Sequence, residues 1–323
     1  MNFIRLVTGS CILAAAASAC SRASSSADDH MAHMSASDMA APNTSGSGSG
    51  SQGTAGLPAS NVNAATRVKD SPRHAEWVKV AWEPGSSDSL MAWVVYPSTS
   101  RTKSPVVVVV HEIFGLQTWV RGVADQVAAD GFIAIAPDLL SRVRGGPSSE
   151  EISGDSARKL IQGVNSTERN KGIIAAARYA TSQPSAAQKY GVVGYCWGGA
   201  TVFMHAVNGG TTGFSGGVAY YGLPYMTGAV PNADSLAKIK VPVMLLNGSK
   251  DARIAAAMPA VDSAMKTLGK KYSAQNYEGA VHGFLRAQDD PKATRDPAEE
   301  AANLAAAKDA WPKTVAFFKQ NLK

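Results

Sequence analysis

The sequence has few cysteines, no dense block of one charge, and only a short apolar run near its start. Three of the 323 residues are cysteine, at positions 11, 20 and 196. The apolar run at residues 11–19 is far shorter than the roughly 20 residues that a membrane-spanning helix needs. The net charge is +6, but the lysines and arginines are scattered along the chain. This distribution predicts mild attraction for anions and no nucleic-acid-binding surface.

A phosphate-binding glycine loop is also lacking. Residues 210–217 (GTTGFSGG) are rich in glycine, but they lack the lysine and the strand-to-helix context of such a loop. The glycines that follow Cys196 belong to a different motif, described below. We therefore expect neither an organic nor a metal cofactor.

The first 19 residues have the features of an export signal. Arg5 supplies a positive charge, residues 11–19 form the apolar core, and small residues end the segment. Cys20 follows directly and resembles the lipidated cysteine of a bacterial lipoprotein lipobox, although Ala17 stands where leucine is usual. The resemblance implies an exported protein anchored by lipid at Cys20 in the periplasm or cell envelope. Cleavage after Ala19 to a soluble periplasmic protein is the alternative.

Residues 20–67 are rich in Ser, Gly, Ala and Met and predict a disordered tether. A cluster within it has soft ligands of the kind that bind copper: His30, Met31, His33, Met34 and Met39. A solvated tether explains the same composition without a metal, and we favour that interpretation.

Residues 68–323 are long enough to form one domain with a single core. Apolar runs of strand length alternate with helical stretches, at 91–97, 106–112, 132–138, 190–196, 216–222, 241–248 and 272–279. This alternation predicts a doubly wound, mostly parallel α/β sheet with helices on both faces. We expect Ser166 or Thr167 to cap one of these helices and Pro312 to break or kink the last one. Ligands bind beyond the carboxyl ends of the strands in such sheets.

Three strand ends carry groups suited to nucleophilic catalysis. Cys196 ends one apolar run, Asp251 follows a second, and His282 follows the last. Nucleophile, acid and histidine have this order in α/β-hydrolases. Cys196 lies between Gly194 and Gly198, which allow the sharp turn that a nucleophile elbow needs. The helix that begins after Cys196 favours a thiolate over a thiol.

The other histidines fit this arrangement less well. His205 lies in an apolar helical stretch and is expected to pack in the core, His74 precedes the first expected strand, and His111 precedes the nucleophile in the chain. Asp234 and Asp262 are the alternatives to Asp251, but neither follows a strand directly.

Five motifs together resemble the dienelactone hydrolase family: HEIFGL, APDLLSR, GYCWGGA, NGSKD and VHGF. The similarity extends from about residue 75 to the C-terminus. It implies the α/β-hydrolase fold and a hydrolase of small esters or lactones, and the best-known substrate of the family is an anionic lactone. Cys196 would be the nucleophile, His282 its base and Asp251 the group that orients the imidazole.

The resemblance also implies roles for five further residues. The backbone N–H groups of Ile113 and Trp197 would form the oxyanion hole. Glu112 would contact the cysteine and help to control its activation. Arg142 and Arg286 match arginines that bind the substrate carboxylate.

The sequence departs from the family pattern in ways that leave the substrate open. Gly283 stands where the dienelactone enzyme has a hydroxyl side chain, and Trp197 replaces a smaller aliphatic residue. Export is a further departure, because ring-cleavage pathways run in the cytoplasm. A broader carboxylesterase or thioesterase for neutral substrates is one alternative, and a non-catalytic binding module on a hydrolase scaffold is another. We expect a monomer that contacts the membrane only through its lipid anchor.

Overall fold

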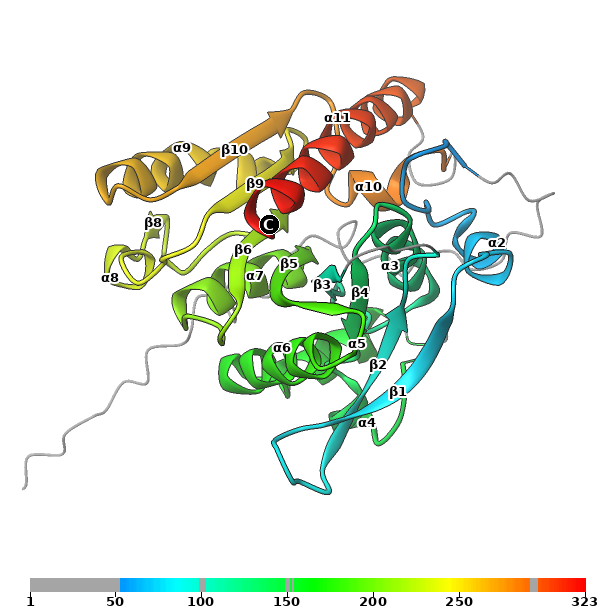
Figure 1. The fold of residues 1–323 in the computed structure, drawn as a ribbon. Helices are drawn as coiled ribbons and strands as arrows, with labels where there is room; N and C mark the ends of the chain where they lie inside the picture. The colour runs from blue at the N-terminus through cyan, green and yellow to red at the C-terminus, as the bar shows by residue number, and fades with distance from the viewer. Residues whose placement is uncertain (1–52, 99–102, 149–151, 153, 291–295) are drawn as a thin grey trace, which may run out of the picture.

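The computed structural model describes residues 53–98, 103–148, 152, 154–290 and 296–323 (Figure 1). The predicted signal peptide, Cys20 and the His/Met cluster lie outside the described residues. None of the helices in the described ranges is long and apolar enough to cross a membrane.

An eight-stranded sheet, in the order β1-β2-β4-β3-β5-β6-β9-β10, organises the domain. Six of its strands run parallel, and β1 and β2 form an antiparallel hairpin at one edge. The strands are β1 (Ala75–Ala81), β2 (Ser89–Val95), β3 (Ser104–Val110), β4 (Ile133–Pro137), β5 (Ala186–Tyr195), β6 (Phe214–Tyr220), β9 (Val243–Gly248) and β10 (Tyr272–Tyr277). The predicted mostly parallel sheet is confirmed. A small second sheet pairs β7 (Met226–Thr227) with β8 (Val230–Pro231).

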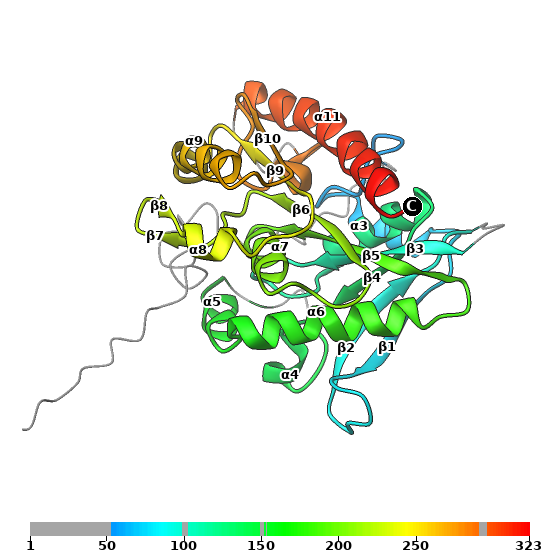
Figure 2. The same ribbon diagram turned by 60° about the vertical axis from the view of Figure 1, so that its left-hand side comes forward.

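The central strand β3 shows why helices cover both faces. Its residues 106–110 are consecutive valines, and all of them are fully buried. Such β-branched residues favour strands, and a strand that is apolar on both sides needs cover on both sides. Figure 2 shows α11 (Pro297–Asn321) on one face of the sheet and α6 (Ser166–Thr181) with α7 (Trp197–Val207) on the other. The remaining helices are α2 (Ala64–Lys69), α3 (Thr118–Ala129), α4 (Ser141–Arg144), α5 (Gly154–Gln162), α8 (Ala233–Leu236), α9 (Ala252–Thr267) and α10 (Phe284–Ala287).

Two local expectations differ from the structure. The cap of α6 is Asn165, not Ser166 or Thr167. Its side chain accepts from Glu168 N while the Glu168 side chain accepts from Asn165 N, so the helix begins with a capping box that was not predicted. The last helix, α11, continues through Pro312 as one element.

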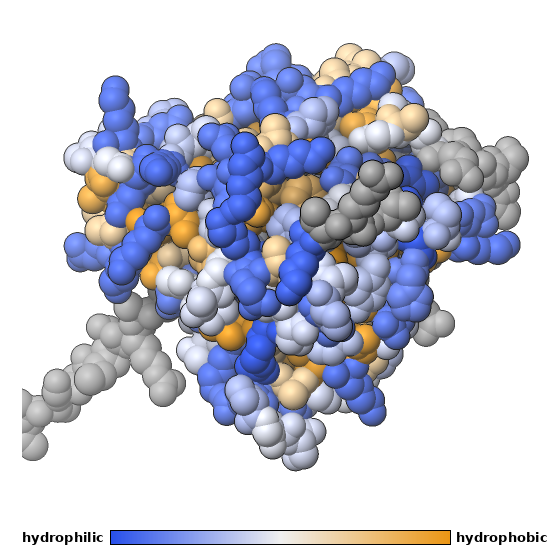
Figure 3. All heavy atoms as spheres, in the orientation of Figure 1, coloured by the Kyte–Doolittle hydropathy of each residue, from blue (hydrophilic) through white to orange (hydrophobic). Residues whose placement is uncertain are grey.

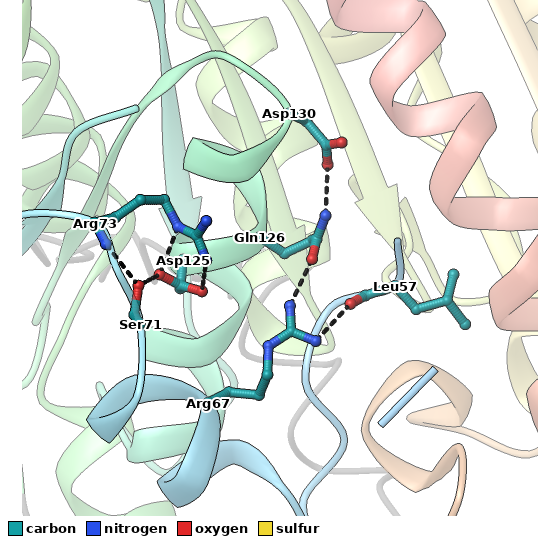
Figure 4. Close-up of polar contacts among 7 residues, drawn as sticks. All are labelled: Leu57, Arg67, Ser71, Arg73, Asp125, Gln126 and Asp130. Carbon is teal, nitrogen blue, oxygen red and sulfur yellow. Dashed lines mark hydrogen bonds and ion pairs between the residues drawn. The ribbon is translucent and has the colours of Figure 1, made fainter. Parts of the chain in front are cut away.

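The ordered domain begins earlier than predicted, because residues 53–67 pack on it instead of belonging to a disordered tether. Residues 57–60 are buried, and α2 begins at Ala64. Figure 4 shows Arg67 donating to the Leu57 carbonyl (3.3 Å) and to Gln126 Oε1 of α3 (2.6 Å). The sequence did not predict this packing, because a Ser- and Ala-rich composition is typical of a disordered tether. The same small side chains also allow a segment to approach a helix closely.

A buried ion pair fixes the chain just before β1. Arg73 donates from Nε and Nη2 to the Asp125 carboxylate of α3 at 2.8 and 2.5 Å, and the Ser71 hydroxyl donates to the same group (Figure 4). The Asp125 side chain is only 4% exposed. The pair therefore joins the start of the hairpin to α3.

The face of the molecule in Figure 3 is mainly polar. On the face in Figure 3, hydrophilic side chains predominate and apolar ones are interspersed among them. The large hydrophobic residues that are well exposed among the described ones are Val62, Val143 and Val230, and they come from three separate segments.

Candidate active site

Cys196 occupies a sharp turn between β5 and α7. Its backbone has φ 57° and ψ −117°, in the left-handed half of conformational space that costs a non-glycine residue about 1–3 kcal/mol. Two hydrogen bonds hold this geometry: Cys196 N donates to Tyr220 O (3.0 Å), and Ala200 N donates to Cys196 O (3.1 Å). The side chain is 2% exposed. The sheet therefore positions the thiol at its carboxyl edge and buries it.

The glycines around Cys196 are required by close backbone approach. A Cβ on Gly194 would lie 2.1 Å from Gly198 O, and one on Gly198 would lie 2.4 Å from Val110 O at the end of β3. A Cβ on Gly199 would lie 2.4 Å from Tyr220 O at the end of β6. The absence of side chains thus lets α7 begin directly against the ends of the two neighbouring strands.

The loops after β9 and β10 bring Asp251 and His282 together. His282 Nδ1 lies 2.6 Å from Asp251 Oδ2, and both side chains are about 5–6% exposed. Asp251 is also the N-cap of α9, where its Oδ1 accepts from Ile254 N at 3.2 Å. Asp234 and Asp262 lie in α8 and α9, and neither pairs with His282 in the described structure.

Charges at this site shift both pKa values in directions that favour an ion pair. Burial alone lowers the pKa of His282, but the negative charge of Cys196 and the hydrogen bond to Asp251 outweigh it and raise that pKa well above its ordinary value. Burial alone raises the pKa of Asp251, but the hydrogen bond and charge of His282 outweigh it and lower that pKa. The arrangement therefore favours a protonated His282 imidazole beside an ionised Asp251 carboxylate.

The second ring nitrogen of His282 is available for proton transfer. Nε2 is buried and has no hydrogen-bond partner within the described structure. Cys196 is near enough to the imidazole for its charge to raise the pKa of His282. The hydrogen bond between a nucleophile and its base is often long or poorly aligned before substrate binds.

Glu112 and Arg286 form an ion pair beside the triad. Arg286 Nε of α10 lies 3.1 Å from Glu112 Oε2, and the Glu112 side chain, just after β3, is 5% exposed. A Cβ on Gly283 would lie 3.4 Å from Arg286 Nη2 and 3.9 Å from Glu112 Oε1. The pair therefore lies close to Gly283, the residue that follows His282 in the sequence.

Tyr221 completes this cluster and was not predicted from the sequence. It has φ 39°, is fully buried, and its ring lies 4.9 Å from the His282 ring. Burial, together with the charge of Glu112, raises its pKa well above the ordinary value, and its hydroxyl has no hydrogen-bond partner among the described groups. Its sequence context, the end of an apolar run, indicates only a buried strand.

The two predicted oxyanion-hole residues lie on either side of the elbow. Trp197 is the first residue of α7, and Ile113 lies in the turn after β3. Neither N–H donates to a backbone acceptor in the turns, loops and caps of the described chain. The Trp197 side chain points into the core, where it stacks on His111 (5.6 Å between centroids) and lies beneath Arg169 (5.1 Å).

The structure does not bring Arg142 to these residues. Arg142 Nη2 lies 2.5 Å from Asp88 Oδ2, Nη1 lies 3.6 Å from Glu168, and the guanidinium stacks 3.9 Å above Trp82. In Figure 1, α4, which carries Arg142, lies beside the β1–β2 hairpin, whereas α10, which carries Arg286, lies near α11. Only Arg286 of the two predicted arginines contacts a residue of the site.

The remaining histidines near the sheet have structural roles. His205 is buried with Nδ1 2.7 Å from Asn170 Oδ1 and Nε2 2.9 Å from the Tyr190 hydroxyl, and burial lowers its pKa to about 3. His111 Nδ1–H donates to Glu112 O (2.5 Å), and Nε2 accepts from Leu139 N (3.0 Å). Within the described ranges, no cluster of three or more His, Cys, Asp or Glu residues is arranged to hold a metal.

Comparison with known proteins bears on the family and the fold. The model of the dienelactone hydrolase family matches residues 90–322. The chain belongs to this family. A carboxymethylenebutenolidase of Pseudomonas putida is 30% identical over 194 residues, 58% of this chain and 78% of that protein. A putative carboxymethylenebutenolidase of Synechocystis sp. is 30% identical over 230 residues, 68% of this chain and 87% of that protein.

Solved structures show the same fold. A putative dienelactone hydrolase from Klebsiella pneumoniae has a TM-score of 0.60 at 24% identity and covers 76% of this chain and 99% of its own. The dienelactone hydrolase-like promiscuous phosphotriesterase P91 from metagenomic libraries has a TM-score of 0.56 at 24% identity, with 74% and 98% coverage. The α/β-hydrolase fold and a hydrolase function follow from family membership.

The His282–Asp251 pair predicts a stability that depends on pH in both directions. The raised pKa of His282 gives a contribution that is complete below the unfolded value of about 6.5 and is lost as pH rises through the folded value. The lowered pKa of Asp251 gives one that is complete above about 3.9 and is lost as pH falls through the folded value. The difference in unfolding free energy between wild type and His282→Gln should therefore be largest between about pH 4 and 6.5. Urea denaturation across pH measures it, and a difference independent of pH would contradict the pairing.

Proposed function

We propose that this chain hydrolyses small carboxylic esters or lactones through Cys196. The observation that supports the proposal most strongly is the buried thiol in a strained elbow beside a histidine whose Nδ1 is held 2.6 Å from Asp251. Family membership supports the reaction class, and the relatives named carboxymethylenebutenolidase support a lactone or ester as substrate.

In the proposed reaction, the Cys196 thiolate attacks the carbonyl carbon and forms a C–S bond. The negative charge that develops on the carbonyl oxygen is stabilised by the N–H groups of Ile113 and Trp197, each worth about 3 kcal/mol in comparable sites. His282 Nε2–H donates its proton to the leaving alkoxide as the C–O bond breaks. Water then attacks the thioester, His282 removes its proton, and the acid leaves as the thiolate is restored. Asp251 keeps the imidazole oriented throughout.

We assign Arg286 to the recognition of an anionic group on the substrate. Its planar guanidinium lies beside His282 and is suited to a carboxylate. Glu112 is its present partner, so an anionic substrate would compete with Glu112 for it and free that carboxylate to act on the thiol. The position after His282 is Gly283, with φ 75°, so it offers no hydroxyl to the same group.

A neutral ester or thioester is the second candidate. The observation that favours it is the neutralisation of Arg286 by Glu112, which leaves little net charge at this side of the site. The chemistry at Cys196 would be unchanged.

Substitutions at the triad test the proposed chemistry. We expect Cys196→Ala to lower kcat for p-nitrophenyl acetate by at least about 10³-fold, because the nucleophile is lost. We expect Asp251→Asn to lower it by about 10²- to 10⁴-fold, because the imidazole loses its orienting acceptor. Asp262→Asn is the matched control and should behave as wild type. Near-normal turnover by a folded Cys196→Ala protein would contradict the proposal. If the wild type turns over none of a wide panel of esters, the non-catalytic binding module is favoured instead.

The charge preference separates the two substrate candidates. We expect Arg286→Gln to lower kcat/KM for an anionic ester, mono-p-nitrophenyl succinate, about 10- to 100-fold more than for neutral p-nitrophenyl acetate. Arg142→Gln should leave this ratio unchanged, because Asp88 and Trp82 hold that arginine elsewhere. A ratio that responds to Arg142 and not to Arg286 would reverse the assignment, and one that responds to neither would favour neutral substrates.

We further propose that the protein is exported and anchored by lipid at Cys20, and that it acts as a monomer in the periplasm or cell envelope. The small residues before Cys20 support the first point. The second is supported by the well-exposed large apolar residues of the described chain, because Val62, Val143 and Val230 come from separate segments. Labelling with a fatty acid that is lost in Cys20→Ser would support the anchor, whereas unlabelled wild-type protein in the periplasmic fraction would favour simple cleavage.

A further inference from the structure

The segment Thr54–Asn63, here called the strap, lies outside the part of the chain that matches the family model. Residues 57–60 of the strap are buried, as is Asn63. The strap runs between α3 and α10, and Figure 1 shows α2, which follows it, beside α3. A segment that only connected a tether to the domain would not need this burial.

Three hydrogen bonds join the strap to α10 and to the two residues that follow this helix. Asn61 N donates to Arg286 O (2.9 Å), Gln288 Nε2 donates to Pro58 O (3.1 Å), and Thr54 Oγ1 donates to Asp289 Oδ2 (3.1 Å). The helix α10 has four residues, and so short a helix is not stable by itself. Its position therefore depends on such tertiary contacts.

The other side of the strap is fixed to α3. Trp119 Nε1 donates to Ala59 O (2.9 Å) in a buried hydrogen bond. A Cβ on Gly122 would lie 2.8 Å from Ala59 Cβ, so a glycine in the helix permits this close approach. The Trp119 ring packs edge-on against Tyr195 (5.0 Å), the residue before Cys196. The strap thus takes its own position from an element that also packs behind the nucleophile.

We propose that the strap is a positioning element of the active site, which fixes α10 and thereby the Arg286 guanidinium beside Glu112. Asn61 is its key residue, because its N–H binds the carbonyl of Arg286 itself. The strap touches no reacting group and acts through Arg286. The consequence for selectivity rests on the proposed role of Arg286 in binding an anionic group.

The test compares Asn61→Pro with Asn61→Ala in the full chain. Proline removes the N–H that binds Arg286 O, whereas alanine keeps it, and position 61 follows the first residue of a turn, where proline is tolerated. We expect Asn61→Pro to lower the ratio of kcat/KM for mono-p-nitrophenyl succinate to that for p-nitrophenyl acetate by about 3- to 10-fold, mainly through KM. Asn61→Ala should keep the wild-type ratio. Hydrogen exchange of the peptide that contains α10 should become faster in Asn61→Pro alone.

A double variant shows whether the strap acts through Arg286. In the Arg286→Gln background, Asn61→Pro should cause no further loss of the ratio, because coupled residues are not additive. Full additivity, or unchanged exchange of α10 in Asn61→Pro, would overturn the proposal. If Asn61→Pro fails to fold, Thr54→Val removes the donor to Asp289 Oδ2 instead. Full additivity with Arg286→Gln, or unchanged exchange of α10 in Thr54→Val, would then overturn the proposal.

The same variants distinguish a failure of the strap proposal from a failure of the proposed function. If Arg286→Gln lowers the ratio and a folded Asn61→Pro does not, the role of the strap is wrong and that of Arg286 stands. If Arg286→Gln itself leaves the ratio unchanged, the proposed role of Arg286 in binding a carboxylate is wrong. The role of the strap in selectivity is then wrong as well.

Discussion

The strained backbone of Cys196 is the constraint on which the site depends. A residue with φ 57° persists only because the surrounding structure holds its N–H and its carbonyl in hydrogen bonds. Gly194, Gly198 and Gly199 also have no side chains, so the backbone of neighbouring segments can approach them closely. The strain has a use, since it places the thiol at the carboxyl edge of the sheet while α7 begins directly behind it. The N-terminus of α7 favours negative charge at that position. The raised pKa of His282 is consistent with this electrostatic arrangement.

Around the elbow, the sheet brings together charges from segments that are distant in sequence. Glu112 follows β3, Asp251 follows β9, and His282 and Arg286 follow β10. All four side chains are largely buried, so their mutual charges act with little screening by water. The four side chains form two pairs, His282 with Asp251 and Arg286 with Glu112. Because each pair joins a basic group to an acidic one, the four ionisable side chains can share a small apolar region.

The sheet, the sharp turn at Cys196 and the pairing of Asp251 with His282 could be predicted because they follow from local patterns. Apolar runs bounded by turn residues mark the strands, and a polar residue directly after such a run, as at Asp251 and His282, marks the edge where ligands bind. The placement of Arg142 and Tyr221 and the packing of residues 53–67 could not be predicted, because each depends on contacts between distant segments. Arg142 is held by Asp88, 54 residues earlier, and the strap is held by Arg286 and Gln288, more than 220 residues later. The predicted end of the tether and the predicted cap of α6 were wrong, because both depend on individual contacts that composition and local sequence do not reveal.

The most direct test of the account is to find the residue that carries the acyl group. A stopped-flow experiment with p-nitrophenyl acetate, followed by acid quenching and peptide mapping by mass spectrometry, would do so. The account predicts an initial burst of p-nitrophenol of about one equivalent and an acetyl group on the peptide that contains Cys196. An acetyl group on another residue, or a burst of the same size in Cys196→Ala, would contradict it.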